Sequence, residues 1–441
     1  PVLWPLMNWE ALLSKERLRG TTSQPEKSRS EFEKDFDRII FSTPFRKLQD
    51  KTQVFPLPKD DFVHTRLTHS MEVSSVGRSL GKSVGEEVIK RHGLHQQVDA
   101  HEIASIVAAA SLAHDTGNPP FGHSGENAIS AYFKDNEGQL RHWYSDEEWQ
   151  DLVNFEGNAQ GFRLLTQSDF QGLNVTFATL CAFTKYPLES SAPKSPVRKS
   201  QKKYGFYQSE KEKFISIAER TGLLNLSNEH VIYSRHPLAF LVEAADDICY
   251  SIIDLEDGCN LGLIGMEEMM ELTIPVIGQS FDATKFKKIK VRSEKSGLLR
   301  AMAIGQLIRG CIEVFLDNES AILAGIYDQA LTSSLPETGA LKEISSVSVA
   351  KIYRSRHVID KEITGYKVID GLLRELLPLA LQSSNSEKNK LLFSIFPEDI
   401  SIRLESEQSV YLRTLYCLDF ISGLTDSRAI NLYRHLNGIS L

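Results

Sequence analysis

The sequence predicts an all-α fold, and the spacing of its apolar residues is the main evidence. In nine stretches, apolar residues recur with the 3.6-residue period of an amphipathic helix. Alternating apolar and polar residues, the pattern of a half-buried strand, are few and short, with residues 401–404 as one candidate. The predicted helical stretches are residues 68–91, 101–113, 124–134, 158–166, 237–254, 266–277, 297–333, 341–360 and 366–382.

Size and composition are those of an ordinary globular protein. The 441 residues allow about two or three domains, and 41% hydrophobic and 24% charged residues are typical values. No run of about 18 apolar residues occurs, and residues 1–20 lack the features of a signal peptide. Five scattered cysteines without CxxC spacing favour reduced thiols over a disulfide framework or a Cys-type zinc site. We therefore expect a cytoplasmic protein with no membrane segment.

The first helix with a candidate metal ligand begins near His69. A turn rich in Pro and Asp at residues 56–61 precedes the histidine, and the helical pattern then runs to Leu80 and beyond. A lone histidine at such a place is more often a cap or a satisfied core residue. His69 therefore matters only together with other ligands.

A second set of candidate ligands follows the apolar run at residues 103–112, which predicts a buried helix. His114 and Asp115 stand where that run ends. Adjacent helical residues point about 100° apart, so both side chains can converge on one cation. A mixed set of histidine and carboxylate ligands suits Mn²⁺, Mg²⁺ or Fe²⁺ better than a thiolate-loving metal.

The third candidate helix covers residues 237–253 and carries Asp246. Pro237 stands in its first turn, where proline is favoured. Three helices can thus each present a ligand: His69, then His114 with Asp115, then Asp246. Each residue alone has an ordinary structural explanation, but four in this order favour a metal site.

The order H…HD…D is the signature of the HD-domain metallohydrolases. Short sequence motifs around these residues make this chain similar to the deoxyguanosine triphosphate triphosphohydrolase family. The motifs run from about residue 35 to 260, with weaker similarity at residues 354–373, including Gly365 and Tyr366. The resemblance implies hydrolysis of a deoxynucleoside triphosphate (dNTP), foremost dGTP, to deoxynucleoside and inorganic triphosphate. It also implies one divalent ion per site, Mn²⁺ or Mg²⁺ first, with Fe²⁺, Co²⁺ or Ni²⁺ as alternatives. The motifs are KTQVF at 51–55, HTRLTHS at 64–70, GNPPFGH at 117–123, FEGNAQ at 155–160 and DDICY at 246–250.

His123 and Glu126 are three residues apart at a predicted helix start, with Ser124 as a possible N-cap. At that spacing both side chains face the same way, and a carboxylate can orient an imidazole and stabilise its cation. The resemblance assigns this pair to catalysis. The alternative for Glu126 is an ordinary acidic residue of a helix first turn.

Cationic side chains are needed beside the metal, because two ligand carboxylates nearly neutralise a divalent ion and the substrate brings about four negative charges. Arg66 stands three residues before His69 and shares its helix face. Lys185 and Tyr186 open a basic segment, and the resemblance gives all three residues a role in phosphate contact. For Arg66 a structural salt bridge is an equal alternative.

Asp246, Tyr250 and Asp254 are spaced four and four, so they form one stripe on a helix. The resemblance places Tyr250 against C2′ of the sugar and assigns Asp254 and Gln53 to the 3′-OH. The alternative is a tyrosine packed at a helix interface and a solvated aspartate. The resemblance also implies that the C-terminal part closes the pocket through Arg356 and its neighbours.

Residues 185–213 form a basic loop in a chain whose net charge is −8. The loop holds eight basic and three acidic residues, and its prolines interrupt regular structure. A solvated surface loop is the ordinary interpretation. A contact with phosphate or single-stranded DNA is the alternative, with Tyr204, Phe206 and Tyr207 as interleaved aromatic residues.

We expect three regions: an N-terminal segment at 1–34, an HD-type catalytic core at 35–280 containing the basic loop, and a helical C-terminal region at 281–441. The charged stretch at 281–296 is the candidate boundary. The resemblance and the loop together suggest a homo-oligomer, with dNTP or single-stranded DNA as a possible effector. Two other functions stay open: a different HD phosphohydrolase, either a nucleotidase or a phosphodiesterase, and a non-catalytic HD protein that senses nucleotides or binds nucleic acid.

Overall fold

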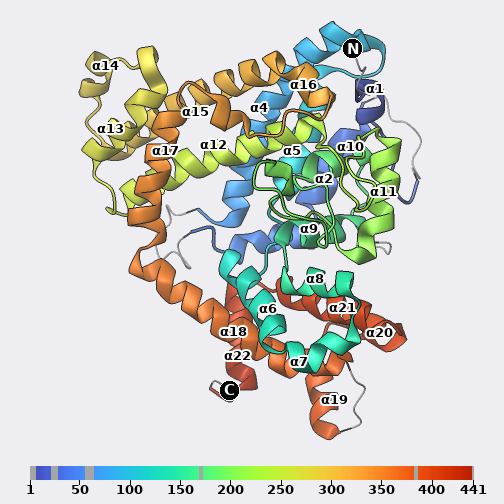
Figure 1. Cartoon of the computed structure of the whole chain (residues 1–441). Coiled ribbons are helices and arrows are strands. Elements are labelled where there is room, and N and C mark those ends of the chain that lie inside the picture. The colour runs from blue at the N-terminus through green and yellow to red at the C-terminus, as the bar shows by residue number, and fades with distance from the viewer. Residues whose placement is uncertain (1–5, 21–27, 55–63, 168–171, 382–385, 440–441) are drawn as a thin grey trace.

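The computed structural model describes residues 6–20, 28–54, 64–167, 172–381 and 386–439, and its regular elements are helices (Figure 1). Extended pairing in these ranges is limited to isolated bridges, such as that between Leu188 and Ile232. The all-α prediction is confirmed. The N-terminal half contains α1 (Trp9–Leu12), α2 (Glu31–Ile40), α3 (Thr43–Lys47), α4 (Arg66–His92), α5 (Ala100–Ala113), α6 (His123–Asp135), α7 (Glu137–Leu140), α8 (Asp146–Val153), α9 (Gly157–Thr166), α10 (Phe177–Phe183) and α11 (Lys211–Arg220).

The C-terminal half continues with long helices that pack back onto this core. It contains α12 (Pro237–Asn260), α13 (Met266–Ile277), α14 (Ala283–Lys288), α15 (Arg292–Asp317), α16 (Glu319–Leu323), α17 (Thr338–Val347), α18 (Arg356–Leu381), α19 (Glu387–Phe393), α20 (Glu398–Ser406), α21 (Val410–Ser422) and α22 (Asp426–Leu436).

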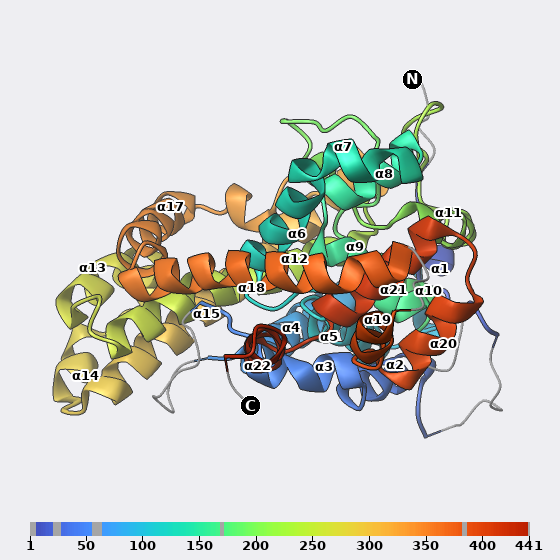
Figure 2. The same cartoon turned by 90° about the horizontal axis from the view of Figure 1, so that it is seen from below.

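Two hydrophobic clusters organise these helices. The first draws on residues from Met7 to Val358 and is built around α4, α5, α12 and α15. The second draws on residues from Phe121 to Leu432 and joins α6 and α8 to α18, α21 and α22. Helix α18 runs across the molecule, from the end of α17 to the group formed by α19 to α22 (Figure 2). The division of the chain near residue 280 stays a prediction.

Helices α4 and α5 approach each other closely because α4 carries glycine at every fourth position. A Cβ atom on Gly81 would lie 3.0 Å from the Cα of Ala104, and one on Gly77 would lie 2.5 Å from Ser111 Oγ. A larger residue at either place would push the two helices apart. This stripe of Gly77, Gly81 and Gly85 therefore sets the distance between the helices that carry His69 and His114.

The ends of α4 and α12 follow local sequence signals. Thr65 caps α4 by accepting a hydrogen bond from the amide of Thr68, and Gly93 ends the helix with a φ of +69°. Pro237 stands in the first turn of α12, as expected. Both helices thus start close to where the sequence predicts, and α4 also ends there, but α12 continues to Asn260, beyond the predicted end at residue 254.

One expected strand and two expected helix boundaries were wrong. Residues 401–404 lie in α20, where Ile400 and Leu404 are buried one turn apart while Ile402 is 58% exposed. The stretch 297–333 is not continuous, because α15 ends at Asp317 and Gly325 adopts a φ of +67°. The pattern at 341–360 is divided near residue 354, and α18 then runs unbroken through residue 366.

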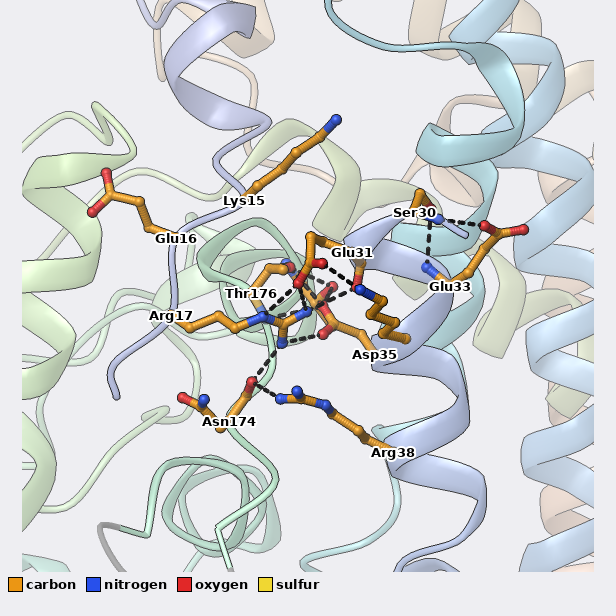
Figure 3. A network of polar contacts seen from close by, with 12 residues as sticks. Lys15, Glu16, Arg17, Ser30, Glu31, Glu33, Asp35, Arg38, Asn174 and Thr176 are labelled. Atoms are coloured by element: carbon orange, nitrogen blue, oxygen red, sulfur yellow. Dashed lines mark hydrogen bonds and ion pairs between the residues drawn. The ribbon is translucent and has the colours of Figure 1, made fainter. Parts of the chain in front are cut away.

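A buried network of charges ties the N-terminal segment to the core (Figure 3). Arg17 donates to Asp35 at 2.6 Å and to Glu31 at 2.9 Å, both on α2. Asp35 also accepts from the Thr176 hydroxyl at 2.6 Å, and Arg38 donates to the carbonyl of Asn174. Buried charges are tolerated when they are paired and hydrogen-bonded in this way.

The five cysteines are all buried and free. Within the described ranges, no helix is both long and apolar enough to cross a membrane.

Candidate functional site

The four predicted metal ligands meet at one point. His69 lies in the first turns of α4, His114 and Asp115 follow the end of α5, and Asp246 lies in the middle of α12. Asp246 Oδ1 is 3.3 Å from His69 Nε2 and 3.6 Å from His114 Nε2. One donor atom from each of His69, His114 and Asp115 falls within 4.8 Å of the others. Residues that are far apart in the sequence thus lie side by side in space.

The protonation of the set suits a cation. His114 Nδ1 lies 2.6 Å from the Ser111 carbonyl and donates to it, which leaves the Nε2 lone pair facing the site. Burial opposes the charge of Asp115, but Arg66 and the two histidines outweigh it and lower the pKa of Asp115 to about 2. His114, His69 and Lys185 outweigh burial at Asp246 and hold its pKa well below the usual value. The two ionised carboxylates and, once deprotonated, the two imidazoles are donors that fit a hard divalent ion.

A cavity of about 470 Å³ lies over this set. Its walls come from α4, α12, α18 and the start of α6. It brings together these residues: Gln53, Val54, Arg66, His69, Asp115, Phe121, His123, Ser124, Asp246, Asp247, Tyr250, Tyr353, Val358, Lys361 and Glu362.

Arg66 makes the salt bridge that was its structural alternative, and it also lines the cavity. Its Nη1 lies 2.7 Å from Asp115 Oδ2. Its Nε is buried and has no hydrogen-bond partner among the described residues. An unsatisfied buried donor of a guanidinium group is available to an anion.

His123 and Glu126 lie at the start of α6, but differently from the sequence expectation. The N-cap is Gly122 with a φ of +60°, not Ser124, which lies inside the helix. L side chains rarely adopt this φ, and a Cβ on Gly122 would also lie 2.5 Å from Arg66 Nη2, so a larger residue would be strained in this turn. His123 opens onto the cavity, whereas Glu126 is buried and accepts from the Gly157 amide at 2.8 Å. No hydrogen bond joins the two side chains within the part of the chain that is described.

The electrostatic surroundings of the pair favour a neutral histidine. His123 is exposed at the cavity, but the protein atoms around it and the charges of Lys203 and Arg66 lower the pKa of its imidazole. Burial raises the pKa of Glu126, while Lys203 and the Gly157 amide act in the opposite direction. A neutral imidazole facing a cavity can accept a proton near neutral pH.

The stripe on α12 is buried at one end and open at the other. Tyr250 is 42% exposed and stacks on Tyr353, with ring centroids 5.5 Å apart and planes 18° apart. The Tyr353 hydroxyl donates to Asp254 Oδ2 at 2.6 Å. Asp254 is only 3% exposed, so it is not the solvated aspartate of the alternative interpretation, and this burial raises its pKa to about 7. Gln53 Oε1 is buried near the cavity without a hydrogen-bond partner in the described ranges.

Four predicted substrate contacts, namely Asp254, Lys185, Tyr186 and Arg356, are not part of the cavity wall. Lys185 instead lies 3.3 Å from Glu243 and places its ammonium group over the Tyr186 ring. The Arg356 side chain is 93% exposed and faces Asp360 at 3.9 Å. The cation that α18 presents to the cavity is Lys361.

The basic loop is anchored rather than loose. Tyr204, Phe206 and Tyr207 are buried in the two hydrophobic clusters, so they do not form a stacking surface for bases. Lys203 pairs with Glu156, and Lys199 pairs with Glu243. The alternative interpretation of this loop, in which these three aromatic residues stack on bases, is therefore contradicted by their burial.

Sequence reasoning missed Tyr353, Lys361, Glu156 and Lys203. Glu156 lies within the family-like motif FEGNAQ, and this motif could have indicated that the residue is part of the site. Lys203 was one of eight basic residues in its loop, and no pattern distinguished it. Tyr353 and Lys361 come from a distant segment that only the folded chain brings to α12.

Comparison with known proteins identifies the family. A family model described as "HD domain" matches residues 66–147. A "Deoxyguanosinetriphosphate triphosphohydrolase-like protein" of Synechocystis sp. is 42% identical, over 99% of this chain and 100% of that protein. A protein of the same name from Pseudomonas aeruginosa is 39% identical, over 98% and 99%. A "Deoxyguanosinetriphosphate triphosphohydrolase" of Salmonella arizonae is 33% identical, over 92% and 94%. The chain therefore belongs to the deoxyguanosinetriphosphate triphosphohydrolase-like family of HD-domain hydrolases.

Proposed function

We propose that the protein hydrolyses a dNTP, foremost dGTP, to deoxynucleoside and inorganic triphosphate, using one divalent ion. The observation that carries this proposal is the meeting of His69, His114, Asp115 and Asp246 at the wall of a cavity that also contains His123 and Tyr250. Mn²⁺ or Mg²⁺ suits this mixed set best, with Fe²⁺, Co²⁺ and Ni²⁺ as alternatives. When bound, such an ion polarises a phosphate oxygen and lowers the pKa of a water molecule.

The reaction breaks the bond between the α-phosphorus and O5′ of the sugar. The oxygen of one water molecule joins the phosphorus, and one proton from that water ends on O5′. We assign transfer of this proton to His123, which faces the cavity and is held neutral, with Glu126 behind it. Acid–base catalysis of this kind contributes roughly 10²–10⁴-fold.

We assign the phosphate tail to the cationic side of the site. Arg66 offers its unpaired Nε, while Lys185 pairs with Glu243 of α12 and lies over the Tyr186 ring. Lys185 and Tyr186 would have to move toward the cavity to touch the substrate. We assign no substrate contact to Arg356 in the conformation described, since it points into solvent.

We assign the sugar to the Tyr250 end of the cavity. The exposed Tyr250 ring would lie against C2′ and leave no room for a 2′-hydroxyl. Asp254 and Gln53 would accept the 3′-OH, with Tyr353 holding the Asp254 carboxylate. A site that hydrogen-bonds a substrate hydroxyl rejects analogues lacking it strongly, because its own polar groups lose their partners.

Product analysis tests the function directly. The purified protein is incubated with each dNTP and Mn²⁺, and the products are resolved by ion-exchange chromatography. Triphosphate and deoxynucleoside as first products support the proposal. Orthophosphate would indicate a nucleotidase and pyrophosphate another phosphohydrolase, while no turnover with metal bound would favour a nucleotide-sensing or nucleic-acid-binding protein.

A cytoplasmic location, a homo-oligomer and an effect of dNTP or single-stranded DNA stay predictions. Light scattering and activity assays with each added effector test the last two. A stable, fully active monomer that responds to neither effector would contradict them.

A further inference from the structure

The carboxylate of Asp426 joins two segments of the cavity wall that are far apart in the sequence. Asp426 opens α22 near the C-terminus and is 2% exposed. Its Oδ2 accepts hydrogen bonds from the hydroxyl of Thr52 at 2.6 Å and from the amide of Thr52 at 3.2 Å. Its Oδ1 accepts a hydrogen bond from the amide of Phe121 at 2.8 Å. One buried side chain thus holds residues that lie 374 and 305 positions earlier in the chain.

The first of these segments leads to the predicted 3′-OH contact. Thr52 directly precedes Gln53, which lines the cavity. Beside Thr52, the carbonyl of Lys51 accepts a hydrogen bond from the amide of Arg66 at 3.1 Å. Arg66 is the first residue of α4 and also lines the cavity. The Asp426 carboxylate therefore helps to determine where Gln53 and Arg66 lie.

The second segment is the turn that leads to His123. Phe121 and Gly122 have φ angles of +66° and +60°, and α6 begins at the next residue. A positive φ is uncommon for a residue other than glycine, so Phe121 needs partners that keep it in this conformation. Its amide is held by Asp426, and its side chain lies against Gly365 of α18, where an added Cβ would be 2.9 Å from the Phe121 Cβ. The direction in which His123 faces the cavity depends on this turn.

A second buried side chain connects the same parts of the chain. Lys51 is 3% exposed and donates to the carbonyl of Ser422 at 2.7 Å and to that of Asn118 at 2.5 Å. The hydroxyl of Ser427 donates to Asp50 at 3.0 Å. The junction of α21 and α22 is thus fastened at several points to the same two segments.

We infer that Asp426 is a positioning residue, which holds the His123 turn and the Gln53 segment in place as two walls of the cavity. This inference rests on the proposed function. Asp426 is not among the residues that line the cavity, so it acts through Thr52 and Phe121 rather than on the substrate. Such a contact matters for the rate as well as for stability, because a displacement of a reacting group by about 1 Å can lower the rate about 10²-fold.

The chain contains a matched control for the bond between Asp426 and Thr52. Asp35 of α2 is fully buried and accepts hydrogen bonds from the hydroxyl of Thr176 at 2.6 Å and from its amide at 2.9 Å. This pair has the same chemistry, but it lies in the network of the N-terminal segment (Figure 3), and neither residue lines the cavity. Thr176 also caps α10, so Thr176→Val sets an upper limit on the purely structural effect of losing such a hydroxyl.

The first test compares the steady-state kinetics of wild type and Asp426→Asn with dGTP and Mn²⁺. Asparagine has the shape of aspartate, but its NH₂ group cannot accept a hydrogen bond, so one of the two segments loses its partner. We expect kcat to fall about tenfold to 10²-fold. The bound metal should be retained, because the metal ligands are not the groups that Asp426 holds.

The second test isolates the Gln53 segment. Thr52→Val removes the hydroxyl donor, and the displaced Gln53 should lower the preference for dGTP over its 2′,3′-dideoxy analogue, measured as a ratio of kcat/KM values. Thr52→Ser keeps the hydroxyl and should recover most of that preference. Thr176→Val should keep both the preference and kcat within about twofold of wild type. If Asp426→Asn fails to fold, this series carries the test, since it alters only one donor.

Four outcomes would overturn the inference. The first is a kcat in folded Asp426→Asn within about twofold of wild type. The second is loss of bound metal in that variant, which would show that the ligand set is disturbed rather than His123 and Gln53. The third is an equal effect of Thr52→Val and Thr176→Val, which would make the contact an ordinary contribution to stability. The fourth is an equal effect of Thr52→Val and Thr52→Ser, which would make Thr52 a packing residue.

A measurement without turnover separates this inference from the proposed function. Hydrogen–deuterium exchange, followed by mass spectrometry, reports how well the amides of Thr52 and Phe121 are protected. We expect faster exchange in the peptides that contain these two residues in Asp426→Asn, and unchanged exchange there in Thr176→Val. Equal exchange in wild type and Asp426→Asn would refute the hold of Asp426 on the two segments. If the wild type releases no triphosphate, the proposed function fails, and this exchange measurement still supports or refutes that hold.

Discussion

Removing the hydroxyl of Tyr353 should weaken recognition of the 3′-OH without touching the metal site. The Tyr353→Phe change keeps the ring that stacks on Tyr250 and deletes only the donor to Asp254. Asp254 is buried and its pKa is raised to about 7, so near neutral pH its charge depends on this hydrogen bond. The substitution would raise the fraction of Asp254 that is protonated. The protonated oxygen of that carboxyl group would then no longer accept a hydrogen bond from the 3′-OH.

The size of the effect follows from the pKa. A hydrogen bond to a charged group is worth about 1.5–3 kcal/mol, which corresponds to a rise of about one to two pKa units. At pH 7.5 a group of pKa 7 is about three-quarters charged, and one of pKa 8 to 9 is roughly a quarter to one-thirtieth charged. We therefore expect kcat/KM for dGTP to fall about threefold to twenty-fivefold.

The assay compares dGTP with its 2′,3′-dideoxy analogue, which lacks the 3′-OH. The wild type should strongly prefer dGTP, and Tyr353→Phe should reduce that preference mainly by losing activity on dGTP. Asp254→Asn provides a second test of the same contact. A preference that is unchanged in a folded, metal-loaded Tyr353→Phe protein would refute the role of Asp254 in binding the 3′-OH.

The remaining predictions concern the metal, the sugar and the pH dependence of stability. His114→Ala should remove the metal and the activity together. Glu126→Ala should keep the metal and lower kcat by roughly 10²-fold or more. Metal analysis of both variants checks this, and loss of metal in Glu126→Ala would show that Glu126 is a metal ligand. Tyr250→Ala should narrow the ratio of kcat/KM for dGTP over GTP, because space opens for the 2′-hydroxyl; an unchanged ratio would make Tyr250 a packing residue. Burial raises the pKa of Asp151 to about 7, above its unfolded value, so the folded state holds a proton that the unfolded state releases between about pH 4 and 7. Stability from this group is therefore lost as pH rises through that window, and Asp151→Asn should flatten the fall in Tm; an identical pH profile in both proteins would contradict this.

The sequence predicted the parts of the site that lie on strongly periodic helices. His69, His114 and Asp246 stand on helices whose apolar faces determine which side turns inward, so their meeting could be anticipated from spacing. The cap of α6 was missed because a glycine with positive φ replaces the usual side-chain cap. Residues 401–404 were misread because four residues do not distinguish alternation from a helical face.

Contacts between distant segments could not be predicted. Tyr353 reaches Asp254 across 99 positions of the chain. Lys203 reaches Glu156 from a loop whose path depends on buried aromatic residues rather than on a repeating pattern. Such pairings depend on tertiary packing, which local periodicity does not encode.

The glycine stripe of α4 has a consequence for the choice of ion. Divalent cations differ in radius, and a rigid frame discriminates among them by the gap it holds open between its donors. Gly77, Gly81 and Gly85 make no contact with the cavity, yet they determine how near the backbone carrying His69 comes to the one carrying His114. A single methyl group on Gly81 would increase the distance between the two helices. We therefore expect these three glycines to influence which divalent ion fits the site, although they carry no side chain.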